Sequence, residues 1–301
     1  MTMSDLPVIV AVDGSDHSLR ALQWAASAAR AREAEVLAVH VWPLPPNLYG
    51  VSMQAPEPPP EGQDPVIDGV KQHFQQYEDA PEVRFATISG EPSVVIPELG
   101  SRAQLLVLGS RGRGGFASLL LGSNGRAAAA HARCPVIVVP HRQRGHEAVA
   151  VPYGPVTVGL DPEQTEDEVL HFAFREASRR RSRLQVITTH PVPFSTLTLL
   201  GGVPEGLDTG GPEVAKETVA AQRERLRPFV EEHYPEVAVE PVVAPGDAAG
   251  RLVTASESGA LLVVGRHRRR LRPSALVLGS VSNAVLLHSR CPVAVVPAAA
   301  A

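Results

Sequence analysis

Residues 8–43 read VIVAVDGSDHSLRALQWAASAARAREAEVLAVHVWP, and residues 156–193 read VTVGLDPEQTEDEVLHFAFREASRRRSRLQVITTHPVP. Each stretch starts with a short Val-rich run, continues through a turn and a helical pattern, and ends in a second apolar run. Further matched stretches follow in the same order and end in RCPVIVVP (133–140) and RCPVAVVP (290–297). A long, ordered repeat of this kind indicates two copies of one domain rather than a solenoid of short units.

The apolar runs of the first copy are continuous rather than alternating, which predicts strands buried on both faces, as in a parallel sheet. Apolar residues at helical spacing lie between them, at 16–32 in the first copy and 166–180 in the second, with Asp16 placed to cap its helix. This order predicts an α/β fold of two tandem open, doubly wound parallel-sheet domains of the Rossmann-like type. The predicted strands of the first copy are Val8–Val12, Val36–Val41, Val83–Ile88, Leu105–Leu108 and Val136–Val139.

The repeat also sets the expected domain boundaries. We expect domain one at 1–142, a linker at 143–155 and domain two at 156–301, because the joint is polar and contains Pro and Gly. Long Pro- and Gly-rich inserts, 43–65 and 191–212, follow the second strand of each copy. Their composition predicts loops, either without fixed structure or placed near the ligand edge as a flap or an oligomer contact.

Composition narrows the class of protein. The 301 residues are 44% hydrophobic and 20% charged, as expected for a globular protein with sizeable cores. The net charge of −4 argues against nucleic acid as a partner, and no apolar run is long enough for a membrane span. The first residues lack a signal-peptide pattern, so we expect a cytoplasmic protein. Both cysteines, Cys134 and Cys291, stand in Arg-Cys-Pro-Val, where we expect buried thiols rather than a disulfide scaffold.

A glycine-rich loop, GSRGRGGFASLLLGSN at 109–124, follows the predicted fourth strand. It lacks the P-loop pattern with its lysine, and it does not follow the first strand as the dinucleotide fingerprint does. Gly109 and Gly112 let the backbone approach a ligand, and Gly122 with Ser123 opens a helix whose first turn attracts anions. From these residues alone, two interpretations stay open: a phosphate cradle and a plain connection between strand and helix.

The spacing Gly109-x-x-Gly112, nine residues, then Gly122-Ser123, after a first strand ending in Asp13, resembles the ATP-binding signature of the universal stress protein family. The resemblance covers nearly the whole chain as two tandem domains and implies an adenine-nucleotide α-hydrolase-like fold. It implies that Asp13 contacts the ribose or phosphate, with Gly14 in the same turn, and that the backbone of Val41 meets the adenine. The phosphate-holding residues that it implies are Gly109, Ser110, Arg111, Gly112, Arg113, Gly122, Ser123 and Asn124.

The second copy departs from this pattern. Asp161 matches Asp13, but the loop at 265–282 reads GRHRRRLRPSALVLGSVS, with Arg268 in place of the second glycine and one residue added before Gly279-Ser280. An arginine side chain at a close-approach position would obstruct the phosphates. We therefore predict that the first copy binds ATP and the second binds it weakly or not at all. The basic run itself is either a solvated loop or a site for another anion.

No catalytic set is visible in the sequence. Nucleophile-elbow and zinc motifs are absent, and no carboxylate pair lies near the glycine loop to hold Mg²⁺ for fast phosphoryl transfer. Histidines within predicted elements, including His40, are expected to be packing or surface residues. The resemblance implies a stress-response regulator in which ATP, with or without Mg²⁺, biases conformation or partner binding. Two alternatives stay open: a nucleotide-independent interaction protein of the same fold, and a slow ATPase.

Assembly is the last expectation. Family members dimerise through their last strand, so the resemblance implies that the two copies pair within one chain through Val136–Val139 and Val293–Val296. The pairing would create a pseudo-two-fold axis and would cover two apolar strand edges. A further homodimer is expected, whereas nucleic acid and membrane are not expected as partners.

Overall fold

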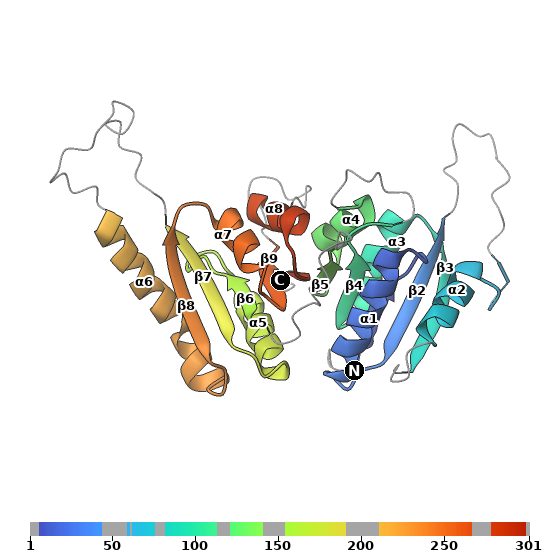
Figure 1. The fold of residues 1–301 in the computed structure, drawn as a ribbon, viewed down its shortest axis with the longest axis horizontal. Helices are drawn as coiled ribbons and strands as arrows, with labels where there is room; N and C mark the ends of the chain where they lie inside the picture. The colour runs from blue at the N-terminus through green and yellow to red at the C-terminus, as the bar shows by residue number, and fades with distance from the viewer. Residues whose placement is uncertain are drawn as a thin grey trace, which may run out of the picture.

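A computed structural model of the chain shows two similar α/β halves joined through one sheet (Figure 1). It describes residues 6–43, 59–60, 62–75, 82–112, 121–140, 154–190, 211–266 and 278–298. Most of both Pro- and Gly-rich inserts lies outside the described residues, as do Arg113, Arg268 and most of the expected linker.

Each half alternates strands with helices, as the sequence predicts. The elements of the first half are β1 (Val8–Ala11), α1 (Asp16–Arg30), β2 (Val36–Pro43), α2 (Pro65–Phe74), β3 (Val83–Gly90), α3 (Pro92–Leu99), β4 (Leu105–Gly109), α4 (Ser123–His131) and β5 (Val136–Val139). Those of the second half are β6 (Val156–Gly159), α5 (Asp167–Arg179), β7 (Leu184–His190), α6 (Gly211–Pro228), β8 (Val239–Pro245), α7 (Ala248–Ala255), β9 (Leu261–Gly265), α8 (Ser280–His288) and β10 (Val293–Val296). The predicted strands and helices are present, with their ends moved by at most two residues.

The ten described strands form one sheet in the order β3-β2-β1-β4-β5-β10-β9-β6-β7-β8. Neighbouring strands are parallel within each half, whereas β5 and β10 pair antiparallel, with Val138 opposite Val293. The expected pairing of the two last strands within one chain is therefore present. In Figure 1, α2 and β3 lie at one end of the molecule and α6 and β8 at the other, with the β5–β10 junction between the halves.

Helices cover both faces of the sheet, and each face has a core that runs through both halves. One core contains residues of α1, α2, α5 and α6, and the other contains residues of α3, α4, α7 and α8. Successive strand residues alternate between them: Val8 and Val10 belong to the first core and Ile9 to the second. Because both cores cross the junction, the two halves share buried surface on each side of the sheet.

A buried charge cluster also crosses the junction. Arg32, after α1, forms an ion pair with Glu176 of α5, and the two side chains are only 3% and 1% exposed. Burial lowers the pKa of Arg32 to about 10, although the charge of Glu176 opposes that shift. Glu176 also pairs with Arg179 and Arg180, and the Arg180 guanidinium lies 5.4 Å from the ring centroid of Trp24 in α1. Charged contacts therefore join the halves in addition to the sheet.

The start of α1 differs in one detail from the sequence prediction. Ser15, not Asp16, is the N-cap, because its side chain accepts a hydrogen bond from the Ser18 backbone N–H. Asp16 is the exposed first residue of the helix, where its charge faces the positive end of the helix dipole. Asp13, which fixes the turn, places Ser15 in the capping position.

Candidate functional site

The carboxyl ends of β1 and β4 lie side by side in the first half, with Val10 level with Val107. In the sheet, β2 pairs with β1 on the side away from β4, and β5 pairs with β4 on the side away from β1. The direction of the strand order therefore reverses between β1 and β4, and open α/β sheets bind ligands beyond the carboxyl ends of the strands at such a point. The turn after β1 and the glycine loop after β4 both start at this edge.

The turn after β1 is organised by Asp13. Its Oδ1 accepts hydrogen bonds from the Ser15 backbone N–H at 3.0 Å and from the Ser15 hydroxyl at 2.6 Å. Gly14 between them has a φ of 76°, a left-handed conformation that favours glycine. The turn itself therefore fixes the position of this partly buried carboxylate.

Two glycines of the loop after β4 lie close to neighbouring atoms: a side chain at Gly109 would clash with backbone, and one at Gly112 would displace a carboxylate. A Cβ on Gly109 would lie 2.8 Å from the backbone of His17, at the start of α1. A Cβ on Gly112 would lie 2.5 Å from Oδ2 of Asp13, so the loop backbone passes directly over that carboxylate. Gly122 differs, since its Cβ would meet no described atom nearer than 3.7 Å. The spacing Gly-x-x-Gly thus brings the loop and the β1 turn together.

Ser110 lies between these two glycines and is 3% exposed. Its backbone N–H donates to the carbonyl of Val139, and its own carbonyl accepts from the N–H of Gly122 at 2.8 Å. Its hydroxyl is buried with no hydrogen-bond partner within the described part of the chain. Buried hydroxyls normally have a partner, so this group is one that a ligand or an ordered water would satisfy.

The first turn of α4 begins beside Ser110. Gly122 is its N-cap and contributes no side-chain cap, so Ser123 and Asn124 present backbone N–H groups at the positive end of the helix dipole. Its first turn contains no acidic residue. The arrangement resembles the helix starts that bind phosphate and carboxylate groups.

Val41 lies in β2, which pairs with β1 on the side away from β4. Its side chain is buried, and it stands two residues beyond Val39, whose carbonyl accepts from the N–H of Val12. Val41 is therefore level with Asp13 along the strands. Arg111 is partly buried beside Ser110. The structure thus gathers Asp13, Gly14, Val41, Gly109, Ser110, Arg111, Gly112, Gly122, Ser123 and Asn124 at one edge of the sheet.

The matching edge of the second half is built differently. Both carboxylate oxygens of Asp161 accept hydrogen bonds within its own turn, from the backbone of Glu163 and from the backbone and side chain of Gln164. Pro162 stands where the first half has Gly14, and proline cannot adopt a positive φ. The Asp161 carboxylate therefore caps a local turn.

Arg266 occupies the position that corresponds to Ser110. Both residues directly follow a five-residue strand ending in glycine, and both donate their backbone N–H to the last residue of the neighbouring strand. The Arg266 side chain, however, crosses the junction and donates to the carbonyl of Ala132 at 2.6 Å, just after α4. Part of the predicted basic loop therefore serves as a contact between the halves.

Two other features bear on possible chemistry. Within the described ranges, no three His, Cys, Asp or Glu side chains cluster in a way that could hold a metal ion, and no helix is long and apolar enough to cross a membrane. Cys134 and Cys291 are buried and free, and burial raises the pKa of their thiols to about 12 and about 11. Both thiols are therefore protonated at neutral pH, as buried structural cysteines are.

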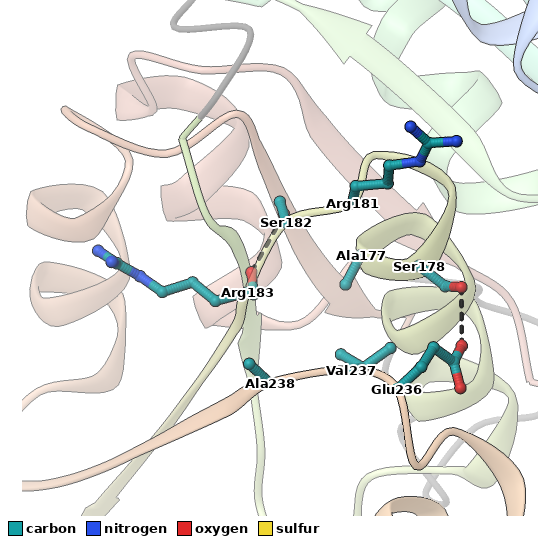
Figure 2. A pocket seen from close by; sticks show the side chains of 8 residues that line it. All are labelled: Ala177, Ser178, Arg181, Ser182, Arg183, Glu236, Val237 and Ala238. Atoms are coloured by element: carbon teal, nitrogen blue, oxygen red, sulfur yellow. Dashed lines mark hydrogen bonds between the residues drawn. The ribbon is translucent and has the colours of Figure 1, made fainter.

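A depression of about 290 Å³ in the second half lies elsewhere, between the end of α5 and the segment before β8. Figure 2 shows that the side chains of Arg181 and Arg183 point in different directions around it. Its walls include Ala177, Val237 and Ala238, and the Glu236 carboxylate accepts from the Ser178 hydroxyl. These groups do not converge on a common point, and the depression lies at the amino end of β7, away from the candidate site.

Three groups of charged contacts were not apparent from the sequence. They are the Arg32–Glu176 pair, the Arg266 contact, and a buried cluster of His40, Asp64 and Thr87. The last has a usable signal, because Asp64-Pro65 matches the N-cap and first position of a helix, and a histidine inside an apolar strand needs a partner. The other two join residues more than 130 positions apart, for which the sequence offers no local pattern.

The universal stress protein family model matches residues 6–140 and, again, residues 152–297. The chain belongs to the universal stress protein family. Universal stress protein Rv2005c of Mycobacterium tuberculosis is 34% identical over 302 residues, with 96% of each chain covered. Universal stress protein Rv2623 of the same species is 30% identical over 311 residues, covering 97% of this chain and 96% of the relative.

Solved structures of universal stress proteins share the fold. A universal stress protein from Archaeoglobus fulgidus superposes with a TM-score of 0.59 at 17% identity, over 99% of this chain and 100% of that chain. Universal stress proteins in complex with cAMP and with dAMP match 44% and 48% of this chain, with TM-scores of 0.30 and 0.31. These scores are too low to transfer a ligand to this chain.

Proposed function

We propose that the first domain of this universal stress protein binds ATP at the edge formed by β1 and β4, and that the bound nucleotide biases the conformation or partner binding of the chain. The observation that carries the proposal is Ser110. Its hydroxyl is buried without a partner among the described residues, directly beside an uncapped helix start. Such a group costs free energy unless a ligand or water satisfies it, and phosphate oxygens are suitable acceptors.

Each residue of the site has a role in this proposal. Asp13 accepts from a ribose hydroxyl or lies against the phosphates, and the backbone of Val41 meets the adenine. The backbone N–H groups of the loop and of the α4 start hold the phosphate oxygens, with charge added by arginine. The phosphate set comprises Gly109, Ser110, Arg111, Gly112, Arg113, Gly122, Ser123 and Asn124. A Mg²⁺ ion, when bound, would neutralise phosphate charge and be held chiefly by the phosphates and water.

A regulatory role follows from what α4 contacts. Its start carries the phosphate site, and the residue after its end, Ala132, accepts the hydrogen bond from Arg266 of the second domain. A ligand shifts a conformational equilibrium only by its difference in affinity for the two states. ATP bound at one end of α4 can favour one packing of the domains through the other end.

The second domain has a different function in this proposal. It keeps the fold but binds nucleotide weakly or not at all, because Pro162 replaces Gly14 in the turn and the long Arg266 side chain, which contacts Ala132, replaces Ser110. It acts instead as an interaction module. Slow ATP hydrolysis is the remaining alternative for the first domain, and we expect no fast turnover.

The test is calorimetric titration of the nucleotide-stripped full chain with ATP. We expect one site per chain. Asp13→Ala and Gly112→Ala should each weaken binding at least about tenfold, because the first removes the turn carboxylate and the second displaces it. Asp161→Ala, the matched change in the second domain, should leave ATP affinity unchanged.

Three outcomes would contradict the proposal. Absence of ATP binding by the wild-type chain would favour the nucleotide-independent function. Two equal sites per chain would contradict the difference between the domains. Multiple-turnover release of phosphate would favour an ATPase.

The same proposal covers the broader organisation of the protein. We place the domains at 1–142 and 156–301, joined by a linker at 143–155, and we infer a cytoplasmic protein that forms a homodimer. Analytical ultracentrifugation with and without ATP measures the oligomeric state. A monomer under both conditions would contradict the homodimer.

A further inference from the structure

A buried polar cluster lies on the face of β2 that α2 covers. His40 of β2 is 7% exposed, and its Nδ1 lies 2.5 Å from Oδ2 of Asp64, the N-cap of α2. The Thr87 hydroxyl of β3 donates to the same oxygen at 2.7 Å. The other oxygen of Asp64 accepts from the backbone N–H groups of Val66 and Ile67. Three elements, β2, β3 and the start of α2, therefore meet at one carboxylate.

The charges of this cluster fix its hydrogen-bonding pattern. Burial alone would raise the pKa of Asp64, but the hydrogen bonds from His40, Thr87 and Val66 together hold that pKa below its usual range. An ionised carboxylate only accepts hydrogen bonds, so Nδ1 of His40 carries the proton that it donates. The bond is therefore charge-assisted, which makes it one of the stronger kinds in proteins.

The cluster is adjacent to the adenine side of the site. Val39 and Val41 both belong to the core that includes α3 and α4, whereas Ala38 belongs to the core that includes α1 and α2. Because strand residues alternate, the His40 side chain points toward α2 and that of Val41 toward the opposite face. The two residues share a peptide bond, so the bond from His40 to Asp64 restrains the backbone at Val41.

The second domain provides a natural comparison. Thr188 occupies the position of His40, since each is the fifth residue of a strand that pairs with the first strand of its domain in the same register. Gln222 of α6 takes the place of the carboxylate, and its amide donates to the Thr188 hydroxyl and to the carbonyl of Val186, each at 3.0 Å. The second strand is thus tied to the next helix in both domains, but an ionised side chain is used only where the nucleotide site is expected.

We propose that His40 is a positioning residue of the nucleotide site: its bond to Asp64 fixes the β2 backbone at Val41, so that the Val41 peptide groups are held ready for the purine base. This inference rests on the proposed function of the first domain. It assigns to the His40–Asp64 pair the recognition of the base, while the glycine loop and α4 hold the phosphates.

The division between base and phosphate gives a specific test. The full chain is titrated with ATP and, separately, with inorganic tripolyphosphate, which lacks the base. The variant His40→Phe removes the bond. The double variant of His40→Leu and Asp64→Asn removes it without leaving an unpaired buried charge, and asparagine is as good an N-cap as aspartate. His40→Gln restores an N–H donor, and Thr87→Val removes a different hydrogen bond to the same carboxylate oxygen.

We expect both variants without the bond to lose about tenfold or more in ATP affinity and to keep the wild-type affinity for tripolyphosphate. His40→Gln should recover most of the loss, and Thr87→Val should change ATP affinity less than about threefold. In the ligand-free chain, the amides of Val41 and Trp42 should exchange hydrogen faster when the bond is absent, because the strand is held less tightly.

Contrary outcomes separate this inference from the proposed function. If the wild-type chain binds ATP and the double variant binds it equally well, the positioning role is wrong while the site stands. An equal loss of ATP and tripolyphosphate affinity would also overturn the positioning role, because it would show a general structural defect. If the wild-type chain binds neither compound, both the proposed function and the role of His40 fail.

Discussion

The two halves of the sheet have the same strand order, but their carboxyl edges are used differently. In the first half, the partly buried Asp13 lies against Gly112, and the Ser110 hydroxyl is buried without a described partner. In the second half, Asp161 caps its own turn and Arg266 reaches across to the carbonyl of Ala132. The same two positions thus belong to the proposed nucleotide site in the first domain, whereas in the second domain one stabilises its own turn and the other contacts the first domain.

This difference shows which parts of a duplicated domain can change while the fold is retained. The strands, the register and both cores are retained, because each half needs them to fold and to pair through β5 and β10. The residues directly after the strand ends are under no such requirement. Differences such as Arg266 in place of Ser110 and Pro162 in place of Gly14 alter this edge without altering the strand order.

The largest expected effect comes from disrupting the antiparallel pairing of β5 with β10, which joins the two halves. Val138 is 2% exposed in β5 and pairs with Val293. Val138→Lys would bury an unpaired charge at the junction and should lower the free energy of unfolding by about 5 kcal/mol or more. Urea unfolding followed by circular dichroism measures the loss.

The matched control for this variant is Val94→Lys, because Val94 is 53% exposed in α3. It should change stability by less than about 0.5 kcal/mol. Intact stability and intact domain pairing in Val138→Lys would show that the β5–β10 junction is wrong.

A second variant tests the charged contact between the halves. Glu176→Gln removes the counter-charge of Arg32, which is 3% exposed, and should cost about 3–5 kcal/mol in the free energy of unfolding. The control is Glu35→Gln, whose ion pair with Arg84 is about 70% exposed on both sides and should contribute less than about 1 kcal/mol. Equal effects of the two changes in thermal unfolding would contradict a buried pair at the junction.

Stability in acid tests the difference between the ionised His40–Asp64 contact of the first domain and the neutral Gln222–Thr188 contact of the second. The pKa of Asp64 is lowered in the folded protein, so its contribution to stability is present above the ordinary carboxyl pKa and is lost as the pH falls through the lowered value. The wild-type chain should therefore lose more stability than Asp64→Asn between about pH 5 and about pH 2. Parallel acid dependence in the two proteins would rule out this contribution.

The smallest expected effect concerns Arg266. Arg266→Ser places the residue of the first domain at the matching position of the second and removes the hydrogen bond to Ala132. We expect a loss of about 1–2 kcal/mol in unfolding free energy, since a single charge-assisted bond is removed. If the start of α4 responds to this contact, ATP affinity should change as well, which titration of the variant would measure.

Sequence patterns predict the fold better than they predict the contacts around the site. Continuous apolar runs such as Val136–Val139 indicate buried parallel strands, and the internal repeat indicates two copies of one α/β domain. The family resemblance supplied the candidate residues around the glycine loop, which the sheet brings to one edge. Asp16 was wrongly expected to cap α1, because the neighbouring Ser15 has the extended backbone that a cap requires.

Long-range polar contacts could not be predicted for a physical reason. A charged residue such as Arg32 or Glu176 has the same local pattern whether it is solvated or paired with a residue 144 positions away. His40 was expected to be a packing or surface residue, and its partner Asp64 belongs to an insert expected to be a loop. Only the folded sheet brings such residues together.

The antiparallel junction has a consequence for synthesis of the chain. Val138 pairs with Val293, about 155 residues later, so β5 leaves the ribosome long before β10 can cover it. At about 5–20 residues per second, the first domain waits for about 8–30 s with an apolar strand edge exposed. During that interval, β5 of a neighbouring nascent chain presents an equivalent apolar edge, with which this edge can pair in place of β10. The four-residue length of β5 keeps that edge short, which limits such encounters until the proper partner arrives.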